Sequence, residues 1–390
     1  MFLVATCQKT SSKDVRIICG MVFSILRTVN SKEALELAWS QIRLEDGISG
    51  KIRLFRPNKA SDLFEIVEQK ALSSSTLKIN GGIKFLPESL LELKNLDTLI
   101  VQGLVENIPN SFQEMDGLKR LVIIPRPWPS DYSDIQDLFS GIEHLKGLEE
   151  ISIVGGKLSD YGLKHVQYLP RRLFAHPTIK TLRIMKLGIF EIPKDIAKSQ
   201  NLELLDIRAN HVRRLSPEIG TLKNLKILQF SDNLLYELPD IFDKLSNVYW
   251  VDLSYNPLNT FPSSFFKLEN LRFLNLNNCN ISAIPAEFGN FKNLEKLLLK
   301  GNEGIQISDE VWNLPHLKIL DLYGCGLQEI PEKLSNVSSL EEIYLAYNYL
   351  REIPSSICGI EHLKIIDVRF NRLKSVPDCI LQKKELKFLK

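Results

Sequence analysis

The chain lacks an excess of charge of either sign. Its 390 residues include 49 Lys and Arg against 47 Asp and Glu, so the net charge is +2. A balance this even gives no general attraction to nucleic acid or to an anionic lipid surface. The sequence also has no uninterrupted apolar run of the roughly 18 residues that a membrane-spanning helix needs. A partner must therefore be recognised by local surface chemistry, and nucleic acid is not an expected partner.

The sequence motifs of common catalytic sites are missing as well. The chain has no GxxxxGK[ST] phosphate loop, no dinucleotide or kinase signature and no GxSxG nucleophile turn. Its six histidines form no HxxxH or HxH pair, and its six cysteines form no CxxC pair. We therefore expect no enzyme activity, no cofactor and no metal site.

The amino-terminal segment leaves two alternatives open. Residues 17–26 read IICGMVFSIL and follow Lys13 and Arg16, which is the layout of a short export signal, but no clean small-x-small cleavage site follows them. In one alternative residues 1–30 are a leader or a disordered segment, and the protein is exported or exposed at the cell surface. In the other they are an ordinary capping segment, and the protein is cytoplasmic.

Repetition is what the chain has in abundance. From Thr178 to Lys384 a 23-residue unit recurs nine times in succession, without an insertion or a deletion. Residues 224–246, for example, read NLKILQFSDNLLYELPDIFDKLS, and residues 270–292 read NLRFLNLNNCNISAIPAEFGNFK. Self-similarity at such a period predicts a solenoid, in which stacked repeats share one continuous core.

Within each repeat, positions are numbered from the first Leu-type residue, so that Leu271 is position 0. The apolar residues at +3 and +5, with polar neighbours between them, predict a short strand. Each strand can pair with the strand of the next repeat, which predicts a parallel sheet with an apolar inner row. The inward pairs are Leu182/Ile184, Leu205/Ile207, Leu228/Phe230, Val251/Leu253, Leu274/Leu276, Leu297/Leu299, Leu320/Leu322, Ile343/Leu345 and Ile366/Val368.

Position +8 is predicted to carry a ladder of buried Asn side chains. An Asn both donates and accepts, so it can satisfy backbone groups left unpaired where the chain turns away from the sheet. Cys279 and Cys325 occupy this position two repeats apart. At about 4.8 Å per strand their thiols lie roughly 10 Å apart, too far for a disulfide, so both are predicted to be buried structural thiols. The Asn residues of the ladder are Asn210, Asn233, Asn256, Asn302, Asn348 and Asn371.

The return path of each repeat is predicted to be a short helical or 3₁₀ turn. Position +13 is apolar in every repeat. Proline, which has no N–H and disfavours a helical conformation at the preceding residue, follows in seven of the nine repeats and should start the turn. These prolines are Pro193, Pro239, Pro262, Pro285, Pro331, Pro354 and Pro377.

The pattern LxxLxLxxNxL followed by an Ile-Pro or Leu-Pro step resembles the leucine-rich repeat family, and in particular its 23-residue class of bacterial and plant intracellular proteins. The resemblance covers residues 178–384 without interruption. It implies an α/β fold, a curved horseshoe-like solenoid with a parallel sheet on the concave face and short helical or 3₁₀ turns on the convex face. It also implies protein binding at the concave face.

Upstream of this region the period is irregular. Residues 72–177 contain repeats one residue short and repeats of about 30 residues, with inserted helices expected at 133–146 and 158–169. Residues 31–71 are expected to form an amino-terminal cap of helix, strand and helix. Residues 178–390 form the regular domain, and no capping helix or cysteine module is expected at its carboxyl end.

Aromatic and acidic side chains recur at the outward positions +2, +4, +6 and +7. Such a composition is typical of protein interfaces, although the rings could instead serve only to cover neighbouring strands. The loop 125–129, PRPWP, is a second candidate that presents Trp128, unless it is only a rigid entry to an inserted helix. The candidate partner-binding residues are Trp250, Asp252, Tyr255, Phe273, Asp321, Tyr323, Tyr344, Tyr347, Asp367, Arg369 and Phe370.

The leading hypothesis for function is a non-catalytic module that binds a protein partner through the concave sheet. One alternative is a structural scaffold in which the carboxyl end docks a second copy of the chain. Another is recognition of a carbohydrate or other cell-surface ligand, because surfaces of aromatic rings and carboxylates serve that purpose too.

Overall fold

The computed structural model describes residues 44–47, 51–54, 75–80, 83–86, 90–91, 93–102, 105–124, 140–155, 169, 171–383 and 386–389. The chain divides into two compact parts, Met1–Ile189 and Phe190–Lys390. We call them the amino-terminal and carboxyl-terminal parts and describe each by itself. The segment 1–30, the Trp128 loop and the helix expected at 158–169, apart from Leu169, lie outside the described residues.

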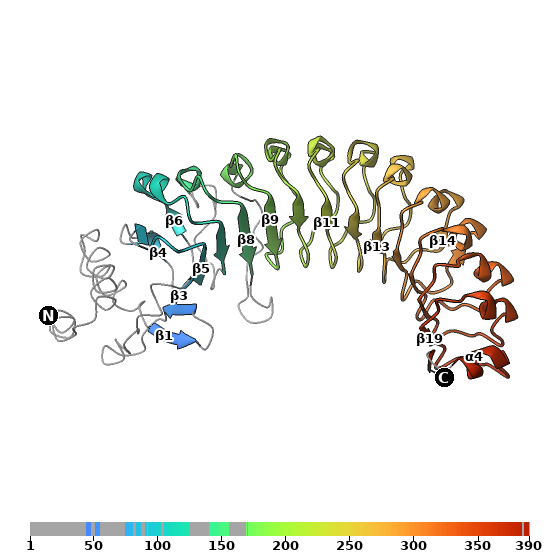
Figure 1. Ribbon diagram of the computed structural model, residues 1–390. Coiled ribbons are helices and arrows are strands. Elements are labelled where there is room, and N and C mark those ends of the chain that lie inside the picture. Colours follow the sequence, from blue (N-terminus) through green and yellow to red (C-terminus); the bar gives the residue numbers. More distant parts are fainter. Residues whose placement is uncertain are drawn as a thin grey trace. The chain divides into compact units, whose positions relative to one another are not determined.

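Short parallel strands stack side by side in the carboxyl-terminal part (Figure 1). From β10 to β19 successive strands pair at an offset of one repeat, so that Leu205, Leu228 and Val251 are direct neighbours. The side chains at +3 and +5 are buried, which confirms the predicted inner rows. The strands are β10 (Leu204–Asp206), β11 (Ile227–Gln229), β12 (Trp250–Asp252), β13 (Phe273–Asn275), β15 (Lys296–Leu298), β17 (Ile319–Asp321), β18 (Glu342–Tyr344), β19 (Ile365–Asp367) and β20 (Lys387–Leu389).

The return path of these repeats runs through short 3₁₀-helices. Figure 1 shows them on the outer side of the bend that the carboxyl-terminal part makes, with the strands on the inner side. Five of these helices are capped by a proline at the predicted position, while η10 begins three residues after Pro239. The predicted solenoid with a parallel concave sheet is therefore confirmed. The helices are η8 (Lys194–Lys198), η9 (Pro217–Thr221), η10 (Phe242–Lys244), η11 (Ser263–Lys267), η12 (Ala286–Asn290), η13 (Asp309–Asn313), η14 (Glu332–Asn336) and η15 (Ser355–Gly359), and a two-stranded sheet of β14 (Ala283–Ile284) and β16 (Gln306–Ile307) precedes η12 and η13.

The buried Asn side chains at +8 join each repeat to the one before it. Asn256 Nδ2 donates to the carbonyl of Phe230 in the preceding repeat at 2.9 Å and to the carbonyl of Leu253 in its own at 2.8 Å. Its Oδ1 accepts a hydrogen bond from the N–H of Leu235 at 2.9 Å. The same three contacts recur at Asn233, Asn302, Asn348 and Asn371, so the predicted ladder is confirmed.

The two cysteines in the ladder replace only the donor half of an Asn. The thiols of Cys279 and Cys325 each donate to a carbonyl of the preceding repeat at 3.2 Å. A thiol offers no oxygen in place of Oδ1, and the N–H groups of Leu258 and Gly304 find backbone carbonyls instead, at 2.8 and 2.9 Å. Burial raises the pKa of Cys279 to about 12 and that of Cys325 to about 11. Both are unpaired buried thiols, as predicted.

The amino-terminal part contains the irregular repeats. Leu77, Leu99, Leu121, Ile151 and Leu182 are aligned on successive parallel strands. This alignment confirms that the first two of these repeats are one residue short and that the next two are longer than a regular repeat. The strands are β3 (Thr76–Asn80), β5 (Thr98–Gln102), β7 (Arg120–Ile123), β8 (Glu150–Val154) and β9 (Thr181–Met185), with β4 (Ile83–Phe85) and β6 (Val105–Asn107) in a separate pair and 3₁₀-helices η4 (Asn110–Glu114), η5 (Ile142–His144) and η7 (Arg171–Phe174).

Two local expectations for this part differ from the structure. Where one strand was expected within 31–71, β1 (Leu44–Gly47) and β2 (Lys51–Leu54) form an antiparallel pair, and β2 continues into the parallel sheet. The helix expected at 133–146 is wrong at its described end. Gly141 has a φ of 80°, and the 3₁₀-helix η5 follows it, because a left-handed residue interrupts a helix. The limits of the domains proposed from the sequence stay a prediction.

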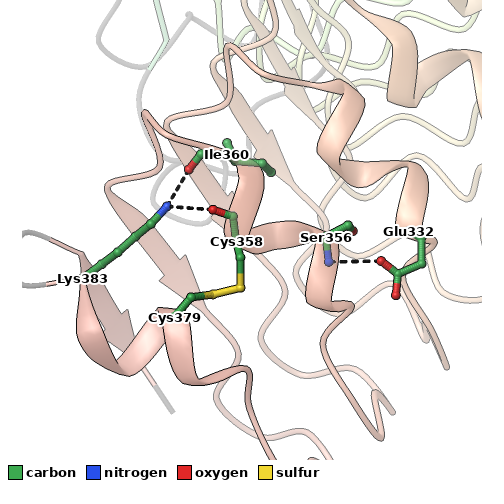
Figure 2. The surroundings of a disulfide bond; sticks show 6 residues. All are labelled: Glu332, Ser356, Cys358, Ile360, Cys379 and Lys383. Carbon is green, nitrogen blue, oxygen red and sulfur yellow. Dashed lines mark hydrogen bonds between the residues drawn. A yellow bond between two sulfur atoms is a disulfide. The ribbon is translucent and has the colours of Figure 1, made fainter.

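A disulfide corrects the expectation that no cysteine module is present at the carboxyl end. It joins Cys358 to Cys379, with their Cα atoms 5.7 Å apart (Figure 2). The short helix α4 (Asp378–Gln382) lies 23 residues after η15, at the same repeat positions, so it is the return turn of the ninth repeat and does not contradict the expectation of no capping helix. Lys383 Nζ donates to the carbonyl of Ile360 at 2.8 Å, which ties the end of α4 to η15. β20 follows β19 at an offset one residue shorter than a regular repeat, so Phe388 lies beside Ile366.

The Asn ladder predicts an order of stability among variants at Asn256. Asn256→Ala should lower the free energy of unfolding by about 3 kcal/mol, because it leaves the buried N–H of Leu235 without its acceptor and removes two donated bonds. Asn256→Cys should lower it less, because a thiol can still donate as Cys279 does. Urea unfolding measures both. Equal losses for the two variants would contradict the division into donor and acceptor roles.

The disulfide should stabilise the carboxyl end by about 3 kcal/mol, the loop-closure value for a crosslink across 21 residues. The double variant Cys358→Ala and Cys379→Ala should therefore unfold at a lower denaturant concentration than the oxidised parent. A reductant should shift the parent toward the double variant and leave the double variant unchanged. A parent that does not respond to reductant would show that the crosslink contributes nothing.

Candidate functional site

Residues at one position of the repeat form continuous rows on the concave face of the carboxyl-terminal part. Each strand pairs with the next at an offset of one repeat, so equivalent side chains lie one strand apart, about 4.8 Å. The outward rows at +2, +4, +6 and +7 differ in chemistry from one repeat to the next. Every candidate residue from the sequence lies in one of these rows.

Position +7 has a left-handed backbone in all nine regular repeats, with φ between 54° and 72°. Glycine fits this conformation, and Asn and Asp tolerate it better than other residues. Gly301, Gly324, Asp232 and Asn278 follow that preference. Three repeats instead place a large ring there, at Tyr255, Tyr347 and Phe370.

These three rings are also the most exposed aromatic side chains in the described residues. Their exposed fractions are 57% for Tyr255, 50% for Tyr347 and 64% for Phe370. A bulky residue in the left-handed region is a true backbone outlier and costs on the order of 1 kcal/mol. Both the left-handed backbone and the high exposure of these three rings are unfavourable for stability, so stability alone does not explain them.

Three aromatic side chains form a continuous row at the carboxyl-terminal end of the sheet. The ring of Tyr347 lies between those of Tyr323 and Phe370, with centroids 4.9 and 4.2 Å away. Lys300 Nζ lies 4.4 Å from the centre of the Tyr323 ring, within range of a cation–π interaction. We call Tyr323, Tyr347 and Phe370 the ring row.

A second pair of rings lies nearer the middle of the sheet. Trp250 and Phe273 are direct neighbours at +2, and their rings stack at 3.6 Å with an interplanar angle of 8°. We call them the ring pair. Tyr255 stands apart, since no ring contact joins it to another described residue. It lies three repeats from Tyr323, or about 14 Å along the sheet. Five of the seven candidate rings therefore fall into two clusters, while Tyr255 and Tyr344 belong to neither.

Tyr344 is half-buried, and its hydroxyl already has a hydrogen-bond partner. Its hydroxyl donates to Glu342 Oε2 at 2.7 Å, and this hydrogen bond raises the pKa of Tyr344 to about 12. The contact lies along a single strand, two residues apart. Tyr344 thus fills the +4 row with a polar group that is already satisfied.

The aspartates of the +4 row share a backbone contact but differ in their partners. In each, Oδ1 accepts the N–H two residues later, at 3.0 to 3.2 Å. Asp206 and Asp367 also form two-point ion pairs with Arg208 and Arg369. No Lys or Arg among the described residues forms a salt bridge with Asp252 or Asp321, and Ser254 Oγ donates to Asp252 at 2.7 Å.

The two kinds of aspartate have opposite pKa shifts. Hydrogen bonds from Arg369 lower the pKa of Asp367. Burial raises the pKa of Asp321, because its carboxylate is partly removed from water without an ion-pair partner. Asp321 therefore places a poorly compensated negative charge beside the ring row.

Sequence reasoning missed several neighbours of this surface. Lys300 was not considered because its row, +6, is mostly small or neutral. Tyr236 and Tyr349 are exposed rings beyond the strand, and each is covered by an Arg, Arg214 at 5.2 Å and Arg372 at 4.7 Å. They were missed because only strand positions were examined as outward-facing. In the described part of the chain, no group of His, Cys, Asp and Glu could hold a metal ion, and no helix has the length and hydropathy to cross a membrane.

Comparisons with known proteins agree with this architecture. A family model described as leucine rich repeat matches residues 200–258, 246–303 and 315–373. No curated protein matches the sequence. A structure of an LRR protein from Leptospira interrogans is 22% identical, with a TM-score of 0.51, over 76% of this chain and 83% of that protein.

Two further solved structures are similar in fold. An internalin from Listeria monocytogenes is 18% identical with a TM-score of 0.58, over 84% of this chain and 89% of the internalin. A plant peptide hormone receptor in complex with RGF2 is 20% identical with a TM-score of 0.60. The match covers 89% of this chain but only 59% of the receptor.

Replacement by Asn is predicted to have opposite effects on stability at Asp321 and at Asp367. Asp321→Asn should raise the free energy of unfolding at neutral pH by about 0.5 kcal/mol, because an amide keeps the backbone contact, as Asn275 does, without a buried charge. A raised pKa means that the penalty is absent below the ordinary Asp pKa and grows as the pH rises through the folded-state pKa. The advantage should therefore disappear in acid.

Asp367→Asn should instead destabilise the fold at neutral pH by roughly 0.5–1 kcal/mol, because Arg369 loses its partner at a partly exposed site. A lowered pKa gives stability that is present above the ordinary Asp pKa and is lost as the pH falls through the folded-state value. Thermal unfolding between about pH 3 and pH 7 measures both variants. The same sign for both at neutral pH would contradict the assignment.

Proposed function

We propose that this chain, which is a leucine-rich repeat protein, is a non-catalytic module that binds a protein partner through the concave sheet of its carboxyl-terminal part. The leucine-rich repeat is generally a protein-interaction fold. Among the solved structures of similar fold, a plant receptor is in complex with the peptide RGF2, and Toll is in complex with Spatzle. These similarities support the class of function.

The observation that carries the proposal is the set of exposed rings at the left-handed +7 position. The same position holds Gly, Asn or Asp in four other regular repeats, where it satisfies the backbone at low cost. Tyr255, whose ring contacts no other described ring, adds no packing there, and Phe370 remains 64% exposed although it stacks on Tyr347. Rings on a fixed backbone lose little conformational freedom on binding, which makes them effective anchors.

The surroundings of the ring row fit a protein interface. Its rings are flanked by Lys300 on one side and by the Asp367–Arg369 ion pair on the other, so an apolar centre is bordered by charge. An interface of ordinary size needs about 800 Å² from each partner, and a sheet of this many strands provides the length. Asp321 adds a carboxylate without an ion-pair partner, and it is available to a basic group of the partner.

The test replaces rings by a residue that the chain itself uses at +7. Tyr255→Asn should leave the free energy of unfolding unchanged or raise it by up to about 1 kcal/mol, because Asn tolerates the left-handed backbone. Phe370→Asn should change it less, because the lost stacking on Tyr347 offsets the relief of the backbone. Peptides selected from a random displayed library for binding to the parent protein should bind the double variant at least about tenfold more weakly. Urea unfolding and fluorescence anisotropy measure the two effects.

A matched control removes an exposed ring outside the concave rows. Tyr236→Asn deletes such a side chain beyond the strand and should leave peptide affinity unchanged. Two results would contradict the proposal. One is that peptides selected on the parent bind the double variant equally well, and the other is that only Tyr236→Asn weakens them.

A further inference from the structure

A row of charges of alternating sign runs along one edge of the concave sheet. It consists of the residues at position +1, immediately before each strand. From Lys226 onward, each N–H in this row donates to the +1 carbonyl of the preceding repeat, at 2.7 to 3.0 Å, so the residues are direct neighbours. We call it the edge row; in chain order it reads Glu203, Lys226, Tyr249, Arg272, Glu295, Lys318, Glu341 and Lys364.

Opposite charges meet at every step of the edge row except around Tyr249. Lysine and glutamate side chains pair at Lys226–Glu203 and Lys318–Glu295, each at 2.7 Å. Such exposed pairs contribute little individually, but the alternation also avoids like charges side by side. In the alternating pattern an acid would be expected at position 249. The chain has Tyr249 there, so the two cations Lys226 and Arg272 flank a neutral residue.

The two cations beside Tyr249 differ in how well they are compensated. Lys226 has Glu203 on its other side. Arg272 lies 3.9 Å from Glu295, whose carboxylate is held more closely by Lys318. Positive charge is therefore least compensated at Arg272, on the Tyr249 side of the pair with Glu295.

We call the missing acid at Tyr249, between Lys226 and Arg272, the Tyr249 gap. Residues around it offer further groups to a ligand. The two rings of the ring pair come directly after the edge row, Trp250 after Tyr249 and Phe273 after Arg272. On the next strand, Lys296 lies beside Phe273. The indole N–H of Trp250 is buried and has no hydrogen-bond acceptor among the described residues. The nearest acid on the strand, Asp252, lies three residues from Tyr249, about 10 Å away, and accepts two hydrogen bonds from Ser254.

We infer that the partner places a carboxylate side chain at the Tyr249 gap, between Lys226 and Arg272, and covers the ring pair with an adjacent apolar side chain. The carboxylate would complete the alternation that the chain's own acids complete elsewhere. The predicted ligand is thus a protein segment with an Asp or Glu next to an apolar residue. This inference rests on the proposed function and assigns chemistry to one part of the same face.

The decisive comparison is between Tyr249→Glu and Tyr249→Gln. Glu fills the gap with the chain's own carboxylate, and Gln has the same shape without the charge. Tyr249→Glu should raise the midpoint of thermal unfolding above that of Tyr249→Gln by about 1–3 °C, because it adds opposite-charge neighbours on both sides. A Glu variant no more stable than the Gln variant would overturn the idea that the gap lacks an acid.

Binding uses peptides selected on the parent protein from a random displayed library. We expect the selected peptides to share an acidic residue beside an apolar one and to bind Tyr249→Glu about tenfold more weakly than Tyr249→Gln. Replacing the acid of the peptide by Gln should remove this difference, and so should high salt. Selected peptides that lack an acid, or that bind the two variants equally, would overturn the inference.

The same selection separates failure of this inference from failure of the proposed function. Peptides that lose affinity with Phe370→Asn but do not distinguish Tyr249→Glu from Tyr249→Gln would leave the proposed function standing and overturn only the carboxylate site. Peptides unaffected by any concave substitution would overturn both.

Discussion

The Asn ladder at position +8 is the interaction on which the concave face depends. The strands on the concave face of the carboxyl-terminal part are three residues long, too short to fix their own register. From Asn233 onward, each ladder Asn bonds to a carbonyl of the preceding repeat and to one of its own, which holds successive turns at a constant offset of one repeat. Because of that constant offset, any position of the repeat becomes a row of neighbours about 4.8 Å apart. Residues that recur every 23 positions in the sequence therefore form rows of neighbours on the surface.

The same turn that buries the ladder also sets the conformation of the residue before it. Position +7 is left-handed in every regular repeat, whatever its side chain. The rings of Tyr347 and Phe370 are therefore presented from a backbone that the ladder holds in place. Their mutual stacking fixes them further, so the ring row is ordered before any partner arrives. Charged residues at position +1 become neighbours in the same way. Glu295 and Lys318, for example, lie one repeat apart in the chain and form an ion pair.

Features that follow from the period could be predicted from the sequence, and features that join different positions could not. The inner rows, the Asn ladder and the prolines before the 3₁₀-helices each occupy one position, so counting located them. The disulfide joins Cys358 to Cys379, at different positions of successive repeats, and it depends on the path of the convex return. The candidate rings were located in their rows, but their division into the ring pair and the ring row depends on side-chain packing that spacing does not specify. The edge row was missed because +1 precedes the strand.

In a repeat protein the residues at one position can be compared with one another, because nine repeats place a residue there in the same backbone environment. Solenoid stability is close to a sum of local contributions, so an unfavourable residue in one repeat is tolerated by the rest. Where the chain needs only stability, it uses Gly or Asn at +7 and an acid between two basic residues at +1. Tyr255 and Tyr249 depart from those choices without an evident structural gain, and Phe370 departs from them while stacking on Tyr347. The departures lie on one face, which is the pattern expected when selection acts on a surface and the fold only has to permit it.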